Sequence, residues 1–248
     1  MKKRYRAVIL DLFDTVVNFD YSRLPTAEVR GETVHTTSRA VYEALSSKYE
    51  GIDYALFYDI STRTYLEFEE MKRREERELP SVRRFELLIK NLGITNGGDS
   101  GEFLERLVLA HMNALMTGVV MPEENRAALD YLRKGYRMGL LSNFDYSPAA
   151  MGVIDGFGIG EYLDSVIISA DVGWRKPKRE IFELAARGVG VPEGEIVFVG
   201  DNFDADIVGA KGAGMDAAWL KRDSVKRDAD MTLPDYVIST FPELLNFL

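Results

Sequence analysis

Residues 7–17 read AVILDLFDTVV, and this stretch decides how the chain folds. It opens with bulky apolar residues that do not alternate with polar ones, which is typical of a strand covered on both faces. Asp11 interrupts the apolar run, and Phe13, Asp14 and Thr15 follow it closely. Ligands of parallel α/β sheets bind beyond the carboxyl ends of the strands. The stretch therefore predicts a buried strand over 7–12 and the beginning of a functional site.

Further short apolar runs follow at wide spacing in the second half of the chain. They predict strands at 138–142, 165–170, 196–200, 217–220 and 236–239. Helical patterns lie between or after them, at 122–134, 178–187, 204–212 and 242–247. Strands that alternate with helices predict an α/β fold, with a doubly wound, Rossmann-like parallel sheet as its core.

The segment between the first two predicted strands has a different pattern. Residues 22–117 show no buried strand pattern, and their apolar spacing predicts helices at 33–48, 54–79, 81–92 and 102–116. A helical insertion after the first strand of an α/β core predicts a second, cap-like domain. We therefore expect the core at 1–17 and 118–248 and a helical cap domain at 18–117.

Composition excludes several classes of function. The net charge of −9 argues against a nucleic-acid surface, which needs a basic excess. The absence of cysteine excludes disulfides, thiolate metal sites and a cysteine nucleophile. Early aspartates make the first residues a poor signal peptide, and no uncharged run approaches the roughly 18 residues that span a bilayer. These observations predict a cytoplasmic protein without nucleic-acid or membrane partners, and they leave its oligomeric state open.

Polar clusters are predicted to gather at one edge of the sheet. They are Asp11 to Thr15, Ser142 with Asn143, Lys176 before Pro177, and Asp201 to Asp206. Each cluster alone is best explained as turn or helix-cap residues. Their joint appearance, in this order and near predicted strand ends, instead predicts an active site.

The chemistry of these groups indicates a substrate class. A carboxylate can attack phosphorus to give an aspartyl-phosphate, which divides one difficult displacement into two easier ones. A divalent cation must offset the repulsion between carboxylate and phosphate, and Mg²⁺ prefers a few carboxylates together with substrate oxygens. A lysine with hydroxyl and amide donors, here including Thr15 and Asn143, would hold the phosphoryl oxygens. We predict Mg²⁺ as cofactor and a small phosphate ester as substrate.

These motifs resemble those of the haloacid dehalogenase (HAD) superfamily, in its subfamily with a helical cap after the first motif, over essentially the whole chain. The matching segments are 11–16, 141–143, 176–177 and 200–215, the last reading GDNFDADIVGAKGAGM. The resemblance implies that Asp11 is the nucleophile and that Ser142 and Lys176 bind the transferring group or the nucleophile. It implies a metal site made by Asp11, the Phe13 position, Asp201 and Asp206. Arg30, near the predicted junction of core and cap, is a further candidate for substrate binding.

One position departs from the family pattern. Superfamily phosphatases usually carry a general acid/base aspartate two residues after the nucleophile, where this chain has Phe13. An aromatic residue there, with the Ser-Asn pair of the second motif, resembles the 2-haloacid dehalogenases, which use the same aspartate nucleophile. Asp201 and Asp206 favour a metal-dependent phosphatase, because dehalogenation gives them no metal to hold. A catalytically inactive HAD-fold binding protein is the third alternative. Asp14, a cap residue or a substrate-bound water could replace the missing acid, and a substrate with a good leaving group could need no acid at all.

Overall fold

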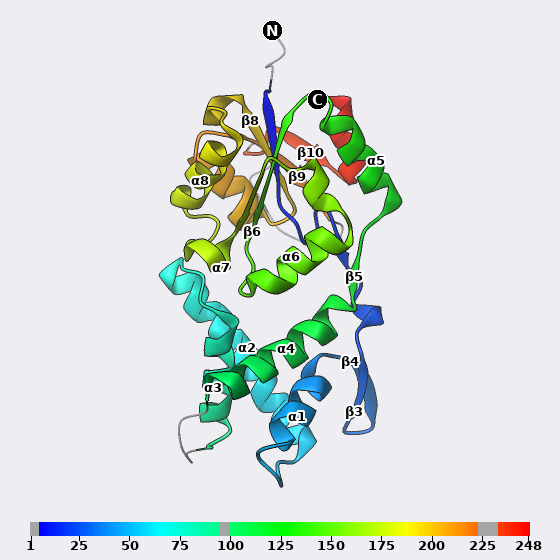
Figure 1. The fold of residues 1–248 in the computed structure, drawn as a ribbon, viewed down its shortest axis with the longest axis vertical. Helices are drawn as coiled ribbons and strands as arrows, with labels where there is room; N and C mark the ends of the chain where they lie inside the picture. The colour runs from blue at the N-terminus through cyan, green and yellow to red at the C-terminus, as the bar shows by residue number, and fades with distance from the viewer. Residues whose placement is uncertain (1–4, 95–99, 223–232) are drawn as a thin grey trace. The chain divides into compact units, whose positions relative to one another are not determined.

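The computed structural model describes residues 5–94, 100–222 and 233–248 (Figure 1). The chain divides into two compact units, Met1–Phe19 with Val120–Leu248, and Asp20–Val119. We call the first the core unit and the second the cap unit. Two short strands, β2 (Asn18–Phe19) and β5 (Val119–Val120), lie where the chain passes between the units.

The core unit is built on a six-stranded parallel sheet in the order β10-β9-β8-β1-β6-β7. Its strands are β1 (Ala7–Leu10), β6 (Arg137–Ser142), β7 (Ser165–Ile168), β8 (Ile196–Gly200), β9 (Asp216–Leu220) and β10 (Tyr236–Ile238). β1 pairs with β6 on one side and β8 on the other, and all its residues are buried. The chain extends the sheet outward from β1 in both directions, which confirms the predicted doubly wound α/β class.

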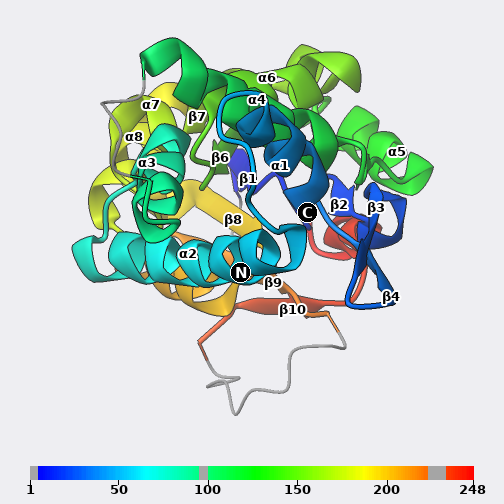
Figure 2. The same ribbon diagram turned by 90° about the horizontal axis from the view of Figure 1, so that it is seen from below.

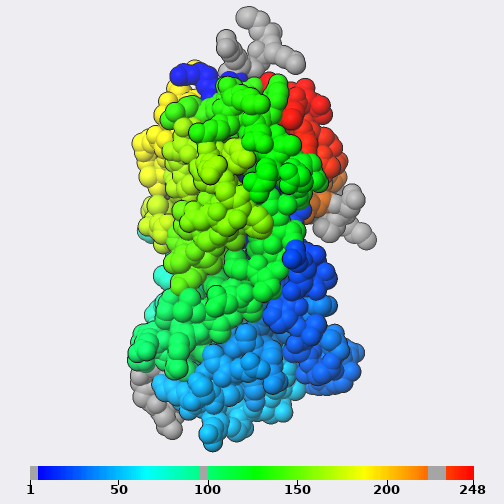
Figure 3. All heavy atoms as spheres, turned by 45° about the vertical axis from the view of Figure 1, so that its right-hand side comes forward, coloured from blue at the N-terminus to red at the C-terminus, as the bar shows by residue number. Residues whose placement is uncertain are grey.

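Helices cover both faces of this sheet (Figure 1). α5 (Glu123–Leu132) and α6 (Ser147–Gly156) lie over one face, and α8 (Arg179–Val189) and α9 (Gly209–Gly212) lie over the other. α8 buries apolar residues at helical spacing, such as Ile181, Ala185 and Val189, and packs against β6 and β7. In Figure 3 the green atoms of α5 are flanked by the red C-terminal turn, Phe241–Asn246, against which α5 packs.

The described part of the cap unit is mainly helical (Figure 2). Its helices are α1 (Ser38–Ser46), α2 (Tyr54–Glu75), α3 (Ser81–Asn91) and α4 (Gly101–Met116). α4 packs against α1 and α3, and α2 packs against α3. Fully buried side chains such as Leu45, Phe57 and Leu107 form the centre of the unit. α2 is long but polar, and within the described ranges no helix is long and apolar enough to cross a membrane.

The cap unit also contains a hairpin that the sequence analysis did not predict. β3 (Thr26–Val29) and β4 (Glu32–His35) pair antiparallel, so the helix expected over 33–48 begins only at Ser38. The two turn residues, Arg30 and Gly31, have φ values of 52° and 84°, as two-residue hairpin turns require. The expectation of no strand between 22 and 117 is therefore wrong in this segment.

Smaller differences concern the core unit. The first strand ends at Leu10, and the apolar run 165–170 changes after Ile168 into a short helix, α7 (Ser169–Val172). The helix expected over 204–212 begins as a wider π-helical turn, Phe203–Val208. The sequence analysis also missed α6, because proline and two glycines in SPAAMGVIDG lower its helix propensity.

Candidate active site

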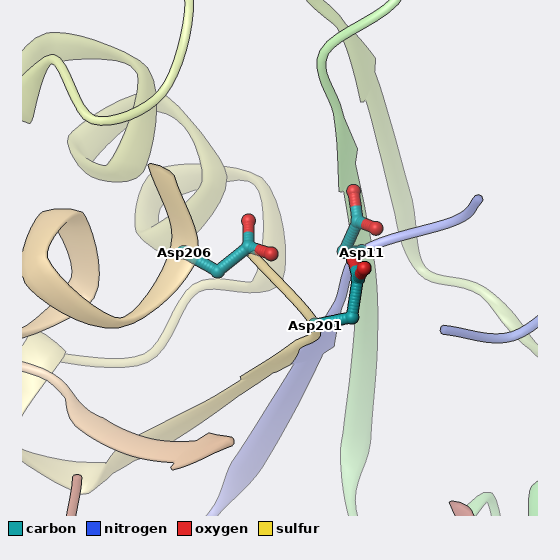
Figure 4. Close-up of side chains that lie close together, drawn as sticks. All are labelled: Asp11, Asp201 and Asp206. Atoms are coloured by element: carbon teal, nitrogen blue, oxygen red, sulfur yellow. The ribbon is translucent and has the colours of Figure 1, made fainter. Parts of the chain in front are cut away.

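Three carboxylates meet at the carboxyl edge of the core sheet. Asp11 follows β1, Asp201 follows the neighbouring β8, and Asp206 comes from the π-helical turn after β8. One carboxylate oxygen from each lies within 4.8 Å of those from the others. Figure 4 shows the Asp11 and Asp201 carboxylates side by side, with that of Asp206 turned towards them. The parallel pairing of β1 and β8 brings these side chains together from positions almost 200 residues apart.

Lys176 is the cation of this cluster. Its Nζ lies 2.6 Å from Asp11 Oδ1 and 2.7 Å from Asp206 Oδ1, and its side chain is 2% exposed. Burial by itself would lower the pKa of the lysine, but the two carboxylates outweigh it and the pKa is raised. Lys176 therefore holds a positive charge beside Asp11 throughout the neutral pH range.

Asn143 fixes the backbone of the lysine loop. Its Nδ2 donates to the carbonyl of Lys176 at 3.0 Å, and its Oδ1 accepts the Lys176 N–H at 2.8 Å. The next residue, Phe144, is held in turn because its N–H donates to Ser169 Oγ at 2.8 Å. Asn143, predicted as a substrate contact, thus positions the backbone of Lys176.

Asp206 is held beneath the end of β8. Its Oδ2 accepts the N–H of Asn202 at 2.9 Å, and the carboxylate lies directly against Gly200. A Cβ atom at position 200 would come within 2.3 Å of Asp206 Oδ2. Any side chain at Gly200 would displace the carboxylate, which explains the glycine at this point of the fourth motif.

Ionisation of all three carboxyl groups would give the cluster an excess of negative charge over Lys176. Burial, then the charges of Asp11, Asp206 and Asp14, raise the pKa of Asp201 to about 8. Burial also raises the pKa of Asp206 to about 6, against the opposing effect of Lys176. A divalent cation between the carboxylates would remove this repulsion, and a set of oxygen donors suits Mg²⁺. The residues present therefore fit the predicted metal.

Two hydroxyls of the predicted site lie at the same edge, whereas Arg30 lies in the other unit. Thr15 Oγ1 donates to Asp11 Oδ2 at 3.2 Å. Ser142 ends β6, and its buried Oγ has no hydrogen-bond partner among the described residues. Arg30 stands in the β3–β4 turn of the cap unit, where its guanidinium pairs with Asp59 of α2 at 2.5 Å.

Residues that the sequence analysis did not single out hold the loop after Asp11. The Nδ2 of Asn125, on α5, donates to the carbonyl of Val16 at 3.0 Å. Arg222, which follows β9, donates from Nε to the carbonyl of Asp14 at 3.1 Å. These partners are more than 100 residues from the loop in sequence, so no local sequence pattern predicts their contacts with it.

Phe13 belongs to a cluster of three aromatic rings. Its ring centroid lies 4.9 Å from that of Phe19, in a stacked arrangement, and 4.6 Å from that of Phe144. All three side chains are half-buried. Asp14 adopts a φ of 58°, and its Oδ1 accepts the Phe19 N–H at 3.1 Å. An apolar ring thus stands where the family pattern has an aspartate.

Comparisons with known proteins give both a family and a fold. The model of haloacid dehalogenase-like hydrolases matches residues 5–214. The glyceraldehyde 3-phosphate phosphatase of Methanopyrus kandleri is 28% identical over 97% of this chain and 96% of its own length. That of Methanothermobacter thermautotrophicus is 35% identical, but the match spans 50% of this chain and 58% of that protein. The crystal structure of a 2-haloacid dehalogenase from Pseudomonas syringae pv. Tomato DC3000 has the same fold, with a TM-score of 0.67, 24% identity, and coverage of 98% of this chain and 97% of that one.

Proposed function

Because this chain belongs to the haloacid dehalogenase-like hydrolase family, we propose that it hydrolyses small phosphate esters with Asp11 as nucleophile and Mg²⁺ as cofactor. The observation that carries the proposal is the third carboxylate. Asp201 adds a third carboxyl group within 4.8 Å of Asp11 and Asp206, and Lys176 does not balance its ionised form. Displacement of halide from carbon involves no dianionic group, so it would leave these carboxylates without a metal to hold.

The proposed reaction has two displacements at phosphorus. A carboxylate oxygen of Asp11 attacks phosphorus, the aspartyl-phosphate bond forms, and the bond to the leaving-group oxygen breaks. The oxygen of a water molecule then attacks the same phosphorus, the bond between phosphorus and the Asp11 oxygen breaks, and the water gives up a proton to the solvent. Inorganic phosphate is released and the Asp11 carboxylate is restored. Lys176, whose Nζ lies 2.6 Å from Asp11 Oδ1, stabilises the charge that develops on the phosphoryl oxygens.

The remaining site residues divide into metal ligands and anion donors. Asp11, Asp201 and the main-chain carbonyl of Phe13 would hold the metal, with Asp206 bound directly or through a water. Mg²⁺ supplies the neutralising charge that lets a carboxylate approach a phosphate. The unpaired hydroxyl of Ser142, the Thr15 hydroxyl and the second Nδ2–H of Asn143 are donors for phosphoryl oxygens. A contact of Arg30 with substrate stays a prediction.

The second candidate is a 2-haloacid dehalogenase, and a single observation favours it. The ring of Phe13 with its aromatic neighbours stands where the phosphatases of the superfamily carry an acid, as it does in the dehalogenase pattern. The two candidates differ in their need for a metal and in the bond that Asp11 breaks. A protein that hydrolyses neither class would be the binding protein of the third alternative.

Metal dependence tests the proposal. We expect a chelator to abolish hydrolysis of p-nitrophenyl phosphate and Mg²⁺ to restore it. Asp201→Ala should lower kcat/KM by about 10²-fold or more, because a ligand of the neutralising cation is lost. Asp204→Ala is the control, since this exposed aspartate lies in the same segment outside the carboxylate cluster. If hydrolysis survives chelation and the enzyme releases halide from 2-chloropropionate, the phosphatase assignment is wrong and the dehalogenase assignment takes its place.

A second readout does not depend on turnover. Mg²⁺ should raise the melting temperature of the wild type but not that of Asp201→Ala, because a ligand that binds only the folded state stabilises it. Protons compete with the cation for carboxylates whose pKa values lie at about 8 and about 6. The rise produced by a fixed Mg²⁺ concentration should therefore be larger at pH 8 than at pH 6.

A further inference from the structure

Two chemically different groups of side chains adjoin the loop that follows Asp11. Lys176 and the carboxylates of Asp201 and Asp206 lie beside Asp11 itself. The rings of Phe13 and its aromatic neighbours Phe19 and Phe144 form a separate, apolar group. In the proposed reaction the charged group serves the attack of Asp11 on phosphorus. Departure of the leaving group raises a separate question, because an alkoxide needs a proton as it leaves.

The described core residues around Asp11 offer no free general acid. Lys176 shares its protons between two carboxylates, and Asp201 and Asp206 must be ionised to hold the metal. The hydroxyls of Thr15 and Ser142 are far weaker acids than a carboxyl or an imidazole. Both histidines of the chain, His35 and His111, belong to the cap unit.

Asp14 is a carboxylate of this loop that is held as a hydrogen-bond acceptor. Its Oδ1 accepts the N–H of Phe19 at 3.1 Å and lies 3.7 Å from Nη2 of Arg222. Arg222 also donates to the Asp14 carbonyl and, at 2.7 Å, to Asn18 Oδ1. These contacts fix the Asp14 carboxylate in the turn as a hydrogen-bond acceptor, so its part is to hold the loop.

From this arrangement, and resting on the proposed phosphatase function, we propose that the enzyme selects substrates by the acidity of their leaving group. It hydrolyses aryl, enol and acyl phosphates and phosphoanhydrides, whose leaving groups depart as stable anions, in preference to alkyl phosphates. The Asp11–phosphorus bond forms as the phosphorus–oxygen bond breaks, and the leaving oxygen departs as its anion and takes a proton from bulk water afterwards. The three rings give planar leaving groups an apolar surface.

The closing experiment measures kcat/KM with Mg²⁺ for two series of matched size. The first contains p-nitrophenyl and p-methylphenyl phosphate, and the second trifluoroethyl and ethyl phosphate. kcat/KM reports formation of the aspartyl-phosphate, so a shared slow second step does not mask the effect. Without an acid, the poorer leaving group in each series should react about 10²-fold or more slowly, which is the usual contribution of general acid catalysis. Pairing within a series separates leaving-group acidity from binding to the rings.

A substitution at Phe13 sharpens the test. Phe13→Asp supplies a carboxyl and should raise kcat/KM for ethyl phosphate relative to trifluoroethyl phosphate by about 10²-fold. Phe13→Asn, of the same size but without an acidic proton, should leave the wild-type ratio unchanged. The wild-type series and its solvent deuterium isotope effect decide the question if either variant fails to fold.

The outcomes separate this proposal from the proposed function. The proposal is supported if kcat/KM falls by about 10²-fold or more from the better to the poorer leaving group in each series, and if kcat/KM shows no normal solvent deuterium isotope effect. Ratios within about threefold, or a normal isotope effect, overturn it, because both require a proton donor at the leaving oxygen. No hydrolysis of any of the four phosphates overturns the phosphatase assignment itself, and this proposal with it.

Discussion

Each unit of the molecule buries a lysine between two carboxylates. In the core unit, Nζ of Lys176 lies 2.6 and 2.7 Å from two aspartates. In the cap unit, Nζ of Lys72 lies 2.5 Å from Glu69 Oε1 and 3.4 Å from Glu78 Oε1. The two lysine side chains are 2% and 6% exposed, and each ammonium lies over a phenylalanine ring at 5.3 and 5.1 Å from its centroid.

The clusters differ in a third carboxylate and in where the groups come from. Asp201 joins the core cluster from the end of a neighbouring strand, and the group around it is the only candidate metal site among the described residues. The cap cluster comes from one end of α2 and the segment after it. A lysine between two carboxylates is therefore a packing arrangement that either unit uses. The third carboxylate at a strand end distinguishes the candidate active site.

The largest effect should come from the nucleophile. Asp11→Asn keeps the size of the side chain but removes most of its nucleophilicity, so kcat/KM for p-nitrophenyl phosphate should fall by about 10³-fold or more. Asp14→Asn is the matched control in the same loop, since its side-chain oxygen can still accept the Phe19 N–H. We expect it to lose less than about tenfold. A phosphorylated enzyme should be trapped by mass spectrometry with wild type only, and undiminished turnover in pure Asp11→Asn would show that no covalent step uses this residue.

The position of Asp11, the proposed nucleophile, is also the feature that the sequence predicts best. Strand β8 occupies the predicted residues 196–200, and β1 and β6 differ from prediction by two residues or fewer. Short apolar runs buried on both faces are local signals, and the residue after such a run must lie at the carboxyl edge. Local pattern alone therefore suffices to place Asp11 and Asp201 at the same edge of the sheet. Their roles as nucleophile and metal ligand stay proposals.

Features that depend on distant partners could not be predicted. Arg222 contacts Asp14 from 208 positions away, and the aromatic stacking of Phe13 with Phe144 depends on the loop after β6. The β3–β4 hairpin is a different case, because the alternation of exposed and buried residues in TAEV and the glycine at 31 are local signals. They were outweighed by the helical pattern that continues into α1.

The second prediction compares the two lysines directly. Lys176→Met and Lys72→Met each leave two carboxylates without their ammonium partner, so both should lower the free energy of unfolding in urea, by up to about 3–5 kcal/mol for the fully buried core cluster. Only Lys176→Met should lower kcat/KM by about 10²-fold, because this ammonium lies 2.6 Å from Asp11, the proposed nucleophile. Activity is measured at a temperature where both variants are folded. An equal loss of activity in Lys72→Met would end the distinction between a catalytic and a structural lysine.

The smallest effect concerns a histidine of the cap unit and its stability. His111 lies on α4 with Nδ1 2.9 Å from Thr37 Oγ1 and its ring 6.1 Å from that of Phe85. Burial, and then the charge of Arg84, hold the pKa of His111 well below 6.5. Below pH 6.5 the unfolded chain binds a proton at His111 that the folded cap does not bind. The free energy of unfolding therefore decreases as the pH decreases, by at most about 1.4 kcal/mol per pH unit.

The carboxylates of the core change the free energy of unfolding with pH in the opposite direction, so their contribution must be subtracted. The raised pKa values of Asp201 and Asp206 mean that the folded core binds protons more readily than the unfolded chain, which favours folding as pH falls from 8 to 6. Comparison of wild type with His111→Asn, whose amide can still pair with Thr37, removes this shared contribution. Between pH 7.5 and 5.5 the wild type should lose about 1 kcal/mol more than the variant, read from hydrogen exchange of the α4 amides. Equal losses would mean that His111 is protonated in the folded cap, and its burial would then need a charged partner.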